Sequence, residues 1–63
     1  DDNKSFEWYK KAAEAGDADA MYELGIIYEI NYQNRYEAAQ WYLKANQAGN
    51  QKAQKAFDRL CGR

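Results

Sequence analysis

Apolar residues recur along this chain at the spacings of three and four that place side chains on one face of an α-helix. In the segment from about residue 18 to residue 29 or 30, the positions that follow this pattern are Met21, Leu24, Ile27 and Tyr28. In the last segment they are Ala53, Ala56, Phe57 and Leu60. The pattern therefore predicts helices that each bury one face.

Four helices are expected, over about residues 3–15, 18 to 29 or 30, 35–48, and 51 to 60 or 61. Gly16 and Gly49 follow the first and the third, and glycine readily adopts the left-handed conformation that ends a helix. Asp17, Asn34 and Asn50 precede the other three helices and can cap their first turns. Because each break is short, consecutive helices are expected to be antiparallel neighbours.

Gly25 lies inside the second expected helix, on the same face as its apolar residues. A glycine in a helix interior costs about 1 kcal/mol relative to alanine. We therefore expect a neighbouring backbone or a large ring to approach the chain closely at this position.

The segment from Trp8 to Gly16 returns 33 positions later as the segment from Trp41 to Gly49. A fixed period of this size is typical of repeat arrays, in which each unit buries its apolar face against its neighbours. The first and third helices are then equivalent, and so are the second and fourth. Because the Trp-Tyr pairs recur with the period, we expect both pairs to pack between helices.

The composition supports helices and argues against sheets. The chain has no Pro, Val or Thr, and Ile is its only β-branched residue type. Ala, Lys, Glu, Gln and Leu are common, and all of them favour helices. The fold class predicted from the residues is therefore all-α.

The recurring residues follow two linked patterns. Ala20, Leu24, Gly25 and Tyr28 fit Ala-x-x-x-Leu-Gly-x-x-Tyr. The second pattern is Ala-x-x-Trp-Tyr-x-Lys-Ala-x-x-x-Gly. It is formed by Ala38, Trp41, Tyr42, Lys44, Ala45 and Gly49. It occurs once more, with Ser in place of the first Ala, at Ser5, Trp8, Tyr9, Lys11, Ala12, Ala13 and Gly16. In these motifs the chain resembles the Sel-one-like repeat family, a branch of the tetratricopeptide-like helical repeats.

This resemblance implies antiparallel helical hairpins stacked as a short right-handed α-solenoid. The four helices would be the second helix of one repeat, one full repeat, and the first helix of the next repeat. Residues 1–63 are then expected to form a single helical-repeat domain with one full repeat plus two half-repeats, as a fragment or trimmed unit of a longer solenoid. The fourth helix departs from the family pattern, with Phe57, Asp58 and Cys61 at the positions of Leu24, Gly25 and Tyr28.

Charge and chemistry exclude several classes of function. The net charge is −1 with acidic and basic residues interspersed, which argues against a general nucleic-acid surface. No apolar run approaches the roughly 20 residues that span a membrane. The chain has no His, and Cys61 is its only cysteine, so no internal disulfide can form. We therefore expect no catalytic residues, no metal and no cofactor.

The resemblance places a concave groove along the first helix of each repeat. The groove would present Asp19, Tyr22, Ile26 and Glu29 from one helix and Lys52, Lys55 and Arg59 from the other. A basic strip beside an apolar spot suits an extended acidic or C-terminal peptide, although three such bases also fit an ordinary solvated face. The predicted partner-binding residues are Tyr22, Ile26, Glu29, Lys55 and Arg59.

The leading hypothesis is a non-enzymatic module that binds a peptide or a partner protein in this groove. The alternative is a structural or self-associating solenoid segment without a ligand of its own. Self-association would use Phe57 and Leu60, which we expect to be partly uncovered without a following helix. Tyr32 and Tyr36, near the expected turn between the second and third helices, either are exposed or fold back over the core.

Overall fold

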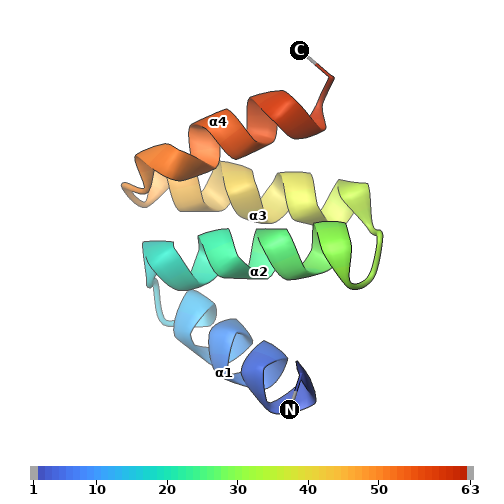
Figure 1. The fold of residues 1–63 in the computed structure, drawn as a ribbon. Coiled ribbons are helices and arrows are strands. Elements are labelled where there is room, and N and C mark those ends of the chain that lie inside the picture. Colours follow the sequence, from blue (N-terminus) through green and yellow to red (C-terminus); the bar gives the residue numbers. More distant parts are fainter. Residues whose placement is uncertain (1, 63) are drawn as a thin grey trace.

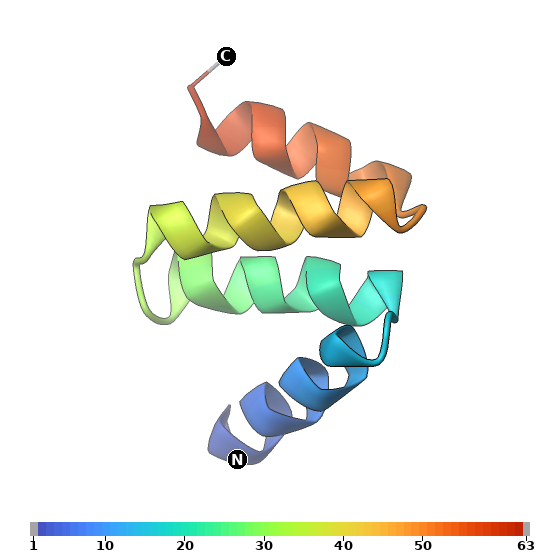
Figure 2. The same ribbon diagram turned by 180° about the vertical axis from the view of Figure 1, so that it is seen from behind.

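The computed structural model describes residues 2–62, and the side chains of residues 5–62. Four helices follow one another: α1 (Asp2–Glu14), α2 (Ala18–Ile30), α3 (Arg35–Gln47) and α4 (Gln51–Leu60). They stack in chain order, with each short connection reversing the direction of the chain (Figures 1 and 2). The prediction of an all-α fold built from stacked hairpins is confirmed, with helix ends within one residue of those expected.

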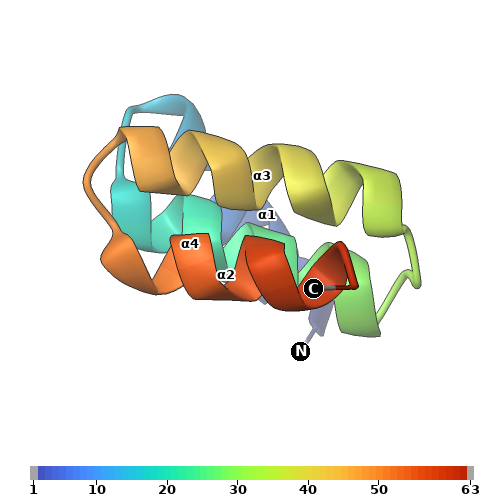
Figure 3. The ribbon, with the colours of Figure 1, turned by 90° about the horizontal axis from the view of Figure 1, so that it is seen from above.

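Seen from above, α4 lies over α2, while α3 runs beside both (Figure 3). α1 crosses α2 obliquely at the other end of the stack (Figure 1). Each helix packs against the next one in the chain. α2 and α4 thus share one side of the molecule, which is where the resemblance places the groove.

The connections between helices have the chemistry expected from the sequence. Gly16 and Gly49 adopt φ values of 101° and 115°, the left-handed region that ends a helix with least strain in glycine. The side chains of Asp17, Asn34 and Asn50 accept hydrogen bonds from backbone N–H groups in the first turns of α2, α3 and α4. The three predicted caps are confirmed.

The core is built mainly from alanines and a few large side chains. Its two clusters of buried residues are Ala38, Tyr42, Ala45, Ala53, Ala56 and Leu60, and Ala13, Ala20 and Leu24. Small residues let the helices approach closely, and the large rings fill the remaining space. Tyr42 and Leu24 are the largest side chains that are fully buried.

Gly25 provides the close approach that the sequence predicts. A Cβ atom added there would lie 2.5 Å from both Cδ1 and Cε1 of Tyr42. The face of the Tyr42 ring therefore rests directly on the backbone of α2.

The expectation that both Trp-Tyr pairs pack between helices is wrong for Trp8, whose exposed fraction is 70%. Its equivalent, Trp41, is half-buried and packs against the cluster formed by Ala13, Ala20 and Leu24. Those residues belong to the two helices that precede α3 in the stack. Trp8 lacks this cover because, within residues 2–62, no helix precedes α1.

The expectation that Phe57 and Leu60 are both partly uncovered holds for Phe57 and is wrong for Leu60, whose exposed fraction is 6%. Phe57 is half-buried and packs against the same core cluster. Both side chains turn toward α3 because Ala38 and Ala45 leave room for α4 to approach. Leu60 is therefore not available for the predicted self-association.

The two tyrosines near the turn between α2 and α3 behave differently. The Tyr32 ring is half-exposed and lies 5.4 Å from the Phe6 ring and 5.7 Å from the Tyr28 ring, measured between centroids. Tyr36 is 72% exposed. Tyr32 thus folds back onto other rings, and Tyr36 faces solvent.

Candidate functional site

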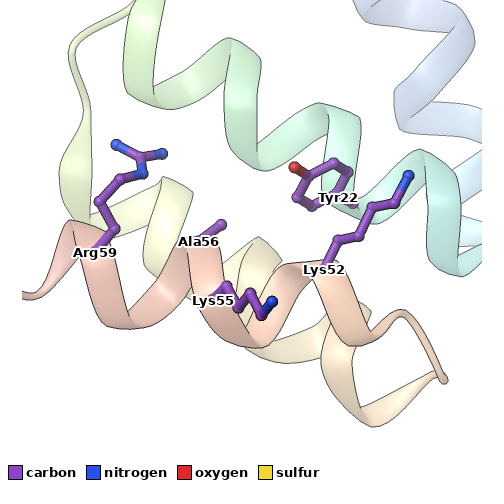
Figure 4. Close-up of a pocket in the computed structure, with 5 residues that line it drawn as sticks. All are labelled: Tyr22, Lys52, Lys55, Ala56 and Arg59. Carbon is purple, nitrogen blue, oxygen red and sulfur yellow. The ribbon is translucent and has the colours of Figure 1, made fainter.

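A cavity of about 310 Å³ opens between α2 and α4. Its lining residues are Tyr22, Lys52, Lys55, Ala56 and Arg59 (Figure 4). α2 contributes the tyrosine and α4 contributes the other four. We call this feature the groove.

The helical period of α4 explains why three bases meet in the groove. Lys52, Lys55 and Arg59 lie three and four positions apart, so they share one face of the helix. The apolar face of the same helix, which includes Ala53 and Leu60, packs into the core. Burial of the apolar face thereby turns the basic face toward α2 and solvent.

Tyr22 and Ala56 form the apolar part of the groove. Tyr22 is half-buried, and its ring centroid lies 5.9 Å from that of Tyr42, with the two planes tilted by 43°. The Tyr42 ring in turn rests on Gly25. These ring contacts brace Tyr22 against the core, so it forms a fixed apolar surface in the groove.

The bases of the groove differ in their electrostatic state. Lys52 and Lys55 are exposed, and in the part of the chain that the structure describes neither forms an ion pair. Arg59 instead makes a bidentate ion pair with Glu29, with Nη1–Oε2 and Nη2–Oε1 distances of 2.8 Å and 3.0 Å. Two positive charges are therefore uncommitted, and the third is neutralised within the molecule.

Glu29 also accepts a hydrogen bond of 2.8 Å from the Tyr42 hydroxyl. The bond from Arg59 lowers the pKa of Glu29, while partial burial acts in the opposite direction. Burial and the bond to Glu29 both raise the pKa of Tyr42. Glu29 is therefore ionised at neutral pH, and Tyr42 is the neutral donor that it needs.

The structure brings together three of the five predicted partner-binding residues, since Tyr22, Lys55 and Arg59 all line the groove. Glu29 lies beside it, where it binds Arg59. Ile26 packs against the core instead. Whether any of these residues contacts a partner stays a prediction.

Two further residues were expected on the groove face, Lys52 and Asp19. Lys52 lines the cavity. Asp19, from the same set, accepts a hydrogen bond from Asn50 at 3.1 Å. Ala56 could not be predicted as a groove residue, because its spacing along α4 marks it as core and only the three-dimensional arrangement brings it to the groove.

Among residues 2–62, no group of three or more His, Cys, Asp or Glu side chains converges as a metal site would. None of the helices described above is both long and apolar enough to cross a membrane. Cys61 is a free, exposed thiol.

The sequence matches the family model of the Sel1 repeat over residues 1–17 and 18–50. The first match covers α1, and the second covers the hairpin of α2 and α3. This division agrees with the predicted order of a second helix followed by one full repeat. Comparisons with curated proteins and with solved structures give no match.

Proposed function

Because the chain belongs to the Sel1 repeat family, whose members are generally non-catalytic scaffolds for protein–protein interaction, we propose that its groove binds an extended acidic peptide segment of a partner protein. One observation carries this proposal. The groove combines an apolar surface, made by Tyr22 and Ala56, with the uncommitted ammonium groups of Lys52 and Lys55.

Charge complementarity selects the class of ligand. A carboxylate of the peptide would be drawn to Lys52 and Lys55, and an apolar side chain beside it would rest on the Tyr22 ring. An exposed ion pair contributes only about 0.2–1 kcal/mol. The affinity would therefore depend on several such contacts together and would fall as the salt concentration rises.

Arg59 would mark one end of the bound segment. Two of the five N–H donors of its guanidinium group are used by Glu29, which leaves three for a peptide carbonyl or carboxylate. Since Glu29 already neutralises this charge, Arg59 would add hydrogen bonds and orientation rather than net attraction.

The test is a binding titration with a labelled peptide of Glu and Leu residues and a matched peptide with Gln in place of Glu. We expect the double substitution Lys52→Ala and Lys55→Ala to weaken binding of the Glu peptide about tenfold, which corresponds to about 1.4 kcal/mol. The Gln peptide should bind the unaltered chain weakly.

The matched control removes two exposed bases from α1, by Lys10→Ala and Lys11→Ala. It makes the same change in net charge but leaves the groove intact, so binding of the Glu peptide should be retained. Equal loss in both double variants would show that attraction to the chain as a whole, not the groove, accounts for binding.

The proposal treats residues 1–63 as one helical-repeat domain. The structural alternative is also supported by one observation, the exposure of Trp8. The equivalent indole in α3, that of Trp41, is half-buried. An exposed indole at this position of α1 is therefore typical of a surface that packs against another helix.

A further inference from the structure

The outer side of α3 carries a line of uncharged side chains. Four exposed residues, spaced three and four positions apart, follow one another along the helix: Tyr36, Gln40, Leu43 and Gln47. We call them the outer stripe of α3. The opposite side of the helix, with Ala38 and Ala45, is buried in the core. Because α3 lies to one side of α2 and α4 (Figure 3), its outer stripe faces away from the groove.

The exposure of this stripe does not depend on where a repeat ends. The three positions of α1 that are equivalent to the last three of the stripe are Glu7, Lys10 and Glu14. They are also exposed, although α2 packs on α1 and α3 follows in the stack. In α3 the same positions are exposed with two helices preceding. These positions therefore lie outside the contacts between helices of the repeat.

The two equivalent helices differ in what they present there. α1 has three charged residues, whereas α3 has none and exposes two apolar side chains. Tyr36 is 72% exposed and Leu43 is 40% exposed. Gln40, between them, can both donate and accept hydrogen bonds. Since the solvated face of a helix is usually charged, the outer stripe of α3 has the character of a contact surface.

One edge of the stripe carries two opposite charges. Glu37 and Lys44 are seven positions apart, which is two turns along the same edge. Within residues 2–62, neither forms an ion pair. The Lys44 ammonium lies 4.6 Å from the centroid of the Trp41 ring, which belongs to the same side of α3. Glu37 lies three positions before Gln40 and Lys44 four positions after it, so the charges are nearly symmetric about Gln40.

This arrangement is complementary to itself. When two copies of α3 lie antiparallel about a two-fold axis at Gln40, Tyr36 of each copy faces Leu43 of the other. Glu37 of each copy faces Lys44 of the other. A two-fold contact repeats every pair, so the interface contains two apolar contacts and two ion pairs.

We propose that two copies of this chain bind each other through the outer stripe of α3, antiparallel and centred on Gln40. A parallel arrangement would place the charged edge against the opposite edge, where Ala39 and Asn46 carry no charge. One helix face buries less than the roughly 1,200 Å² of stable complexes, so the dimer is weak and exchanges rapidly. It leaves the groove open and does not depend on the proposed function.

Sedimentation equilibrium of the full chain tests the proposal, with a reductant present because Cys61 is a free, exposed thiol. We expect a reversible dimer to form between roughly 10 μM and 1 mM. Leu43→Gln should weaken it about tenfold, because the apolar contact is lost twice. Ile30→Gln, at an exposed apolar residue outside the stripe, is the matched control and should dimerise like the unaltered chain.

Exchange of the charges tests the pairing itself. Glu37→Lys alone, and Lys44→Glu alone, each place like charges opposite one another, so each variant should dimerise about tenfold more weakly. The two single variants mixed in equal amounts should form a mixed dimer, since both contacts again join an acid and a base. The double variant should recover dimerisation by itself for the same reason.

The control variants Glu7→Lys and Lys10→Glu make the same changes in net charge on α1. Each should dimerise like the unaltered chain, and their mixture should associate no more tightly. A chain that stays monomeric at roughly 1 mM, or a dimer that Leu43→Gln leaves unchanged, would overturn the proposal. Failure of the mixed Glu37→Lys and Lys44→Glu variants to associate would overturn the antiparallel arrangement.

Discussion

Gly25 and Tyr42 set the distance between α2 and α3. An added Cβ at Gly25 would lie 2.5 Å from two ring carbons of Tyr42, closer than non-bonded carbons can come. The helix loses about 1 kcal/mol of intrinsic stability by having glycine there. Full burial of the Tyr42 ring, and the hydrogen bond from its hydroxyl to Glu29, offset that loss.

This contact leads to a prediction that runs against helix propensity. Gly25→Ala should lower the free energy of unfolding by about 1–3 kcal/mol, because overpacking of a closed contact exceeds the gain in propensity. Urea denaturation measures the change. Gln40→Ala, at an exposed site in α3, serves as the control and should change stability by less than about 0.5 kcal/mol. A stabilised Gly25→Ala variant would contradict the packing described here.

Asn50 shows how one side chain can start a helix and connect it to another. Its Oδ1 accepts a hydrogen bond of 2.9 Å from the N–H of Lys52, in the first turn of α4. Its Nδ2 donates to Asp19, in the first turn of α2, at 3.1 Å. Asn50 is also buried, so both bonds are partly shielded from water. The start of α4 is thereby aligned with the start of α2.

Replacement of Asn50 separates the two roles of its side chain. Asn50→Ala should cost about 1–2 kcal/mol, since the cap is lost and Asp19 loses its donor. Asn50→Ser keeps an oxygen for the cap and should recover part of this loss. Thermal denaturation of both variants measures this difference. If Asn50→Ser and Asn50→Ala melt at the same temperature, the capping oxygen contributes nothing to stability.

The helices could be predicted because their signals are local. Gly16, Asp17 and Asn50 act on neighbouring backbone groups, and the spacing of apolar residues defines each buried face. The exposure of Trp8 could not be predicted, because the repeat shows which residues are equivalent but not which neighbours cover them. The pairing of Glu29 with Arg59 could not be predicted, because the two residues lie 30 positions apart and no local pattern links them.

Across the whole molecule, one polar cluster joins three helices. Glu29 from α2 binds Tyr42 from α3 and Arg59 from α4. Its side chain is 16% exposed, whereas that of Arg59 is 63% exposed. The cluster therefore links the core to the rim of the groove and fixes the direction of the Arg59 side chain.

The lowered pKa of Glu29 predicts how this cluster responds to pH. A carboxyl group whose pKa is lower in the folded state stabilises that state fully above its unfolded pKa, and this stabilisation is lost as the pH falls through the folded value. Glu29→Gln should therefore be less stable than the unaltered chain at neutral pH. The difference should shrink as the pH falls below about 4.5, the ordinary pKa of the group.

Denaturant midpoints of the two proteins, measured at a series of pH values, test this prediction. Glu7→Gln on the exposed surface of α1 controls for the loss of one negative charge. A stability difference between the Glu29→Gln variant and the unaltered chain that stays constant from neutral pH down to about pH 3 would show that the ion pair with Arg59 does not stabilise the fold.

The most direct test of the central claim is to map the bound peptide on the unaltered protein. Backbone amide spectra, recorded during titration with the Glu and Leu peptide, report which residues change environment. We expect saturable shifts concentrated at Tyr22, Lys52, Lys55 and Ala56, with smaller shifts along α1. Shifts centred on Trp8, or no saturable shifts in the groove, would contradict the claim that the space between α2 and α4 is the binding site.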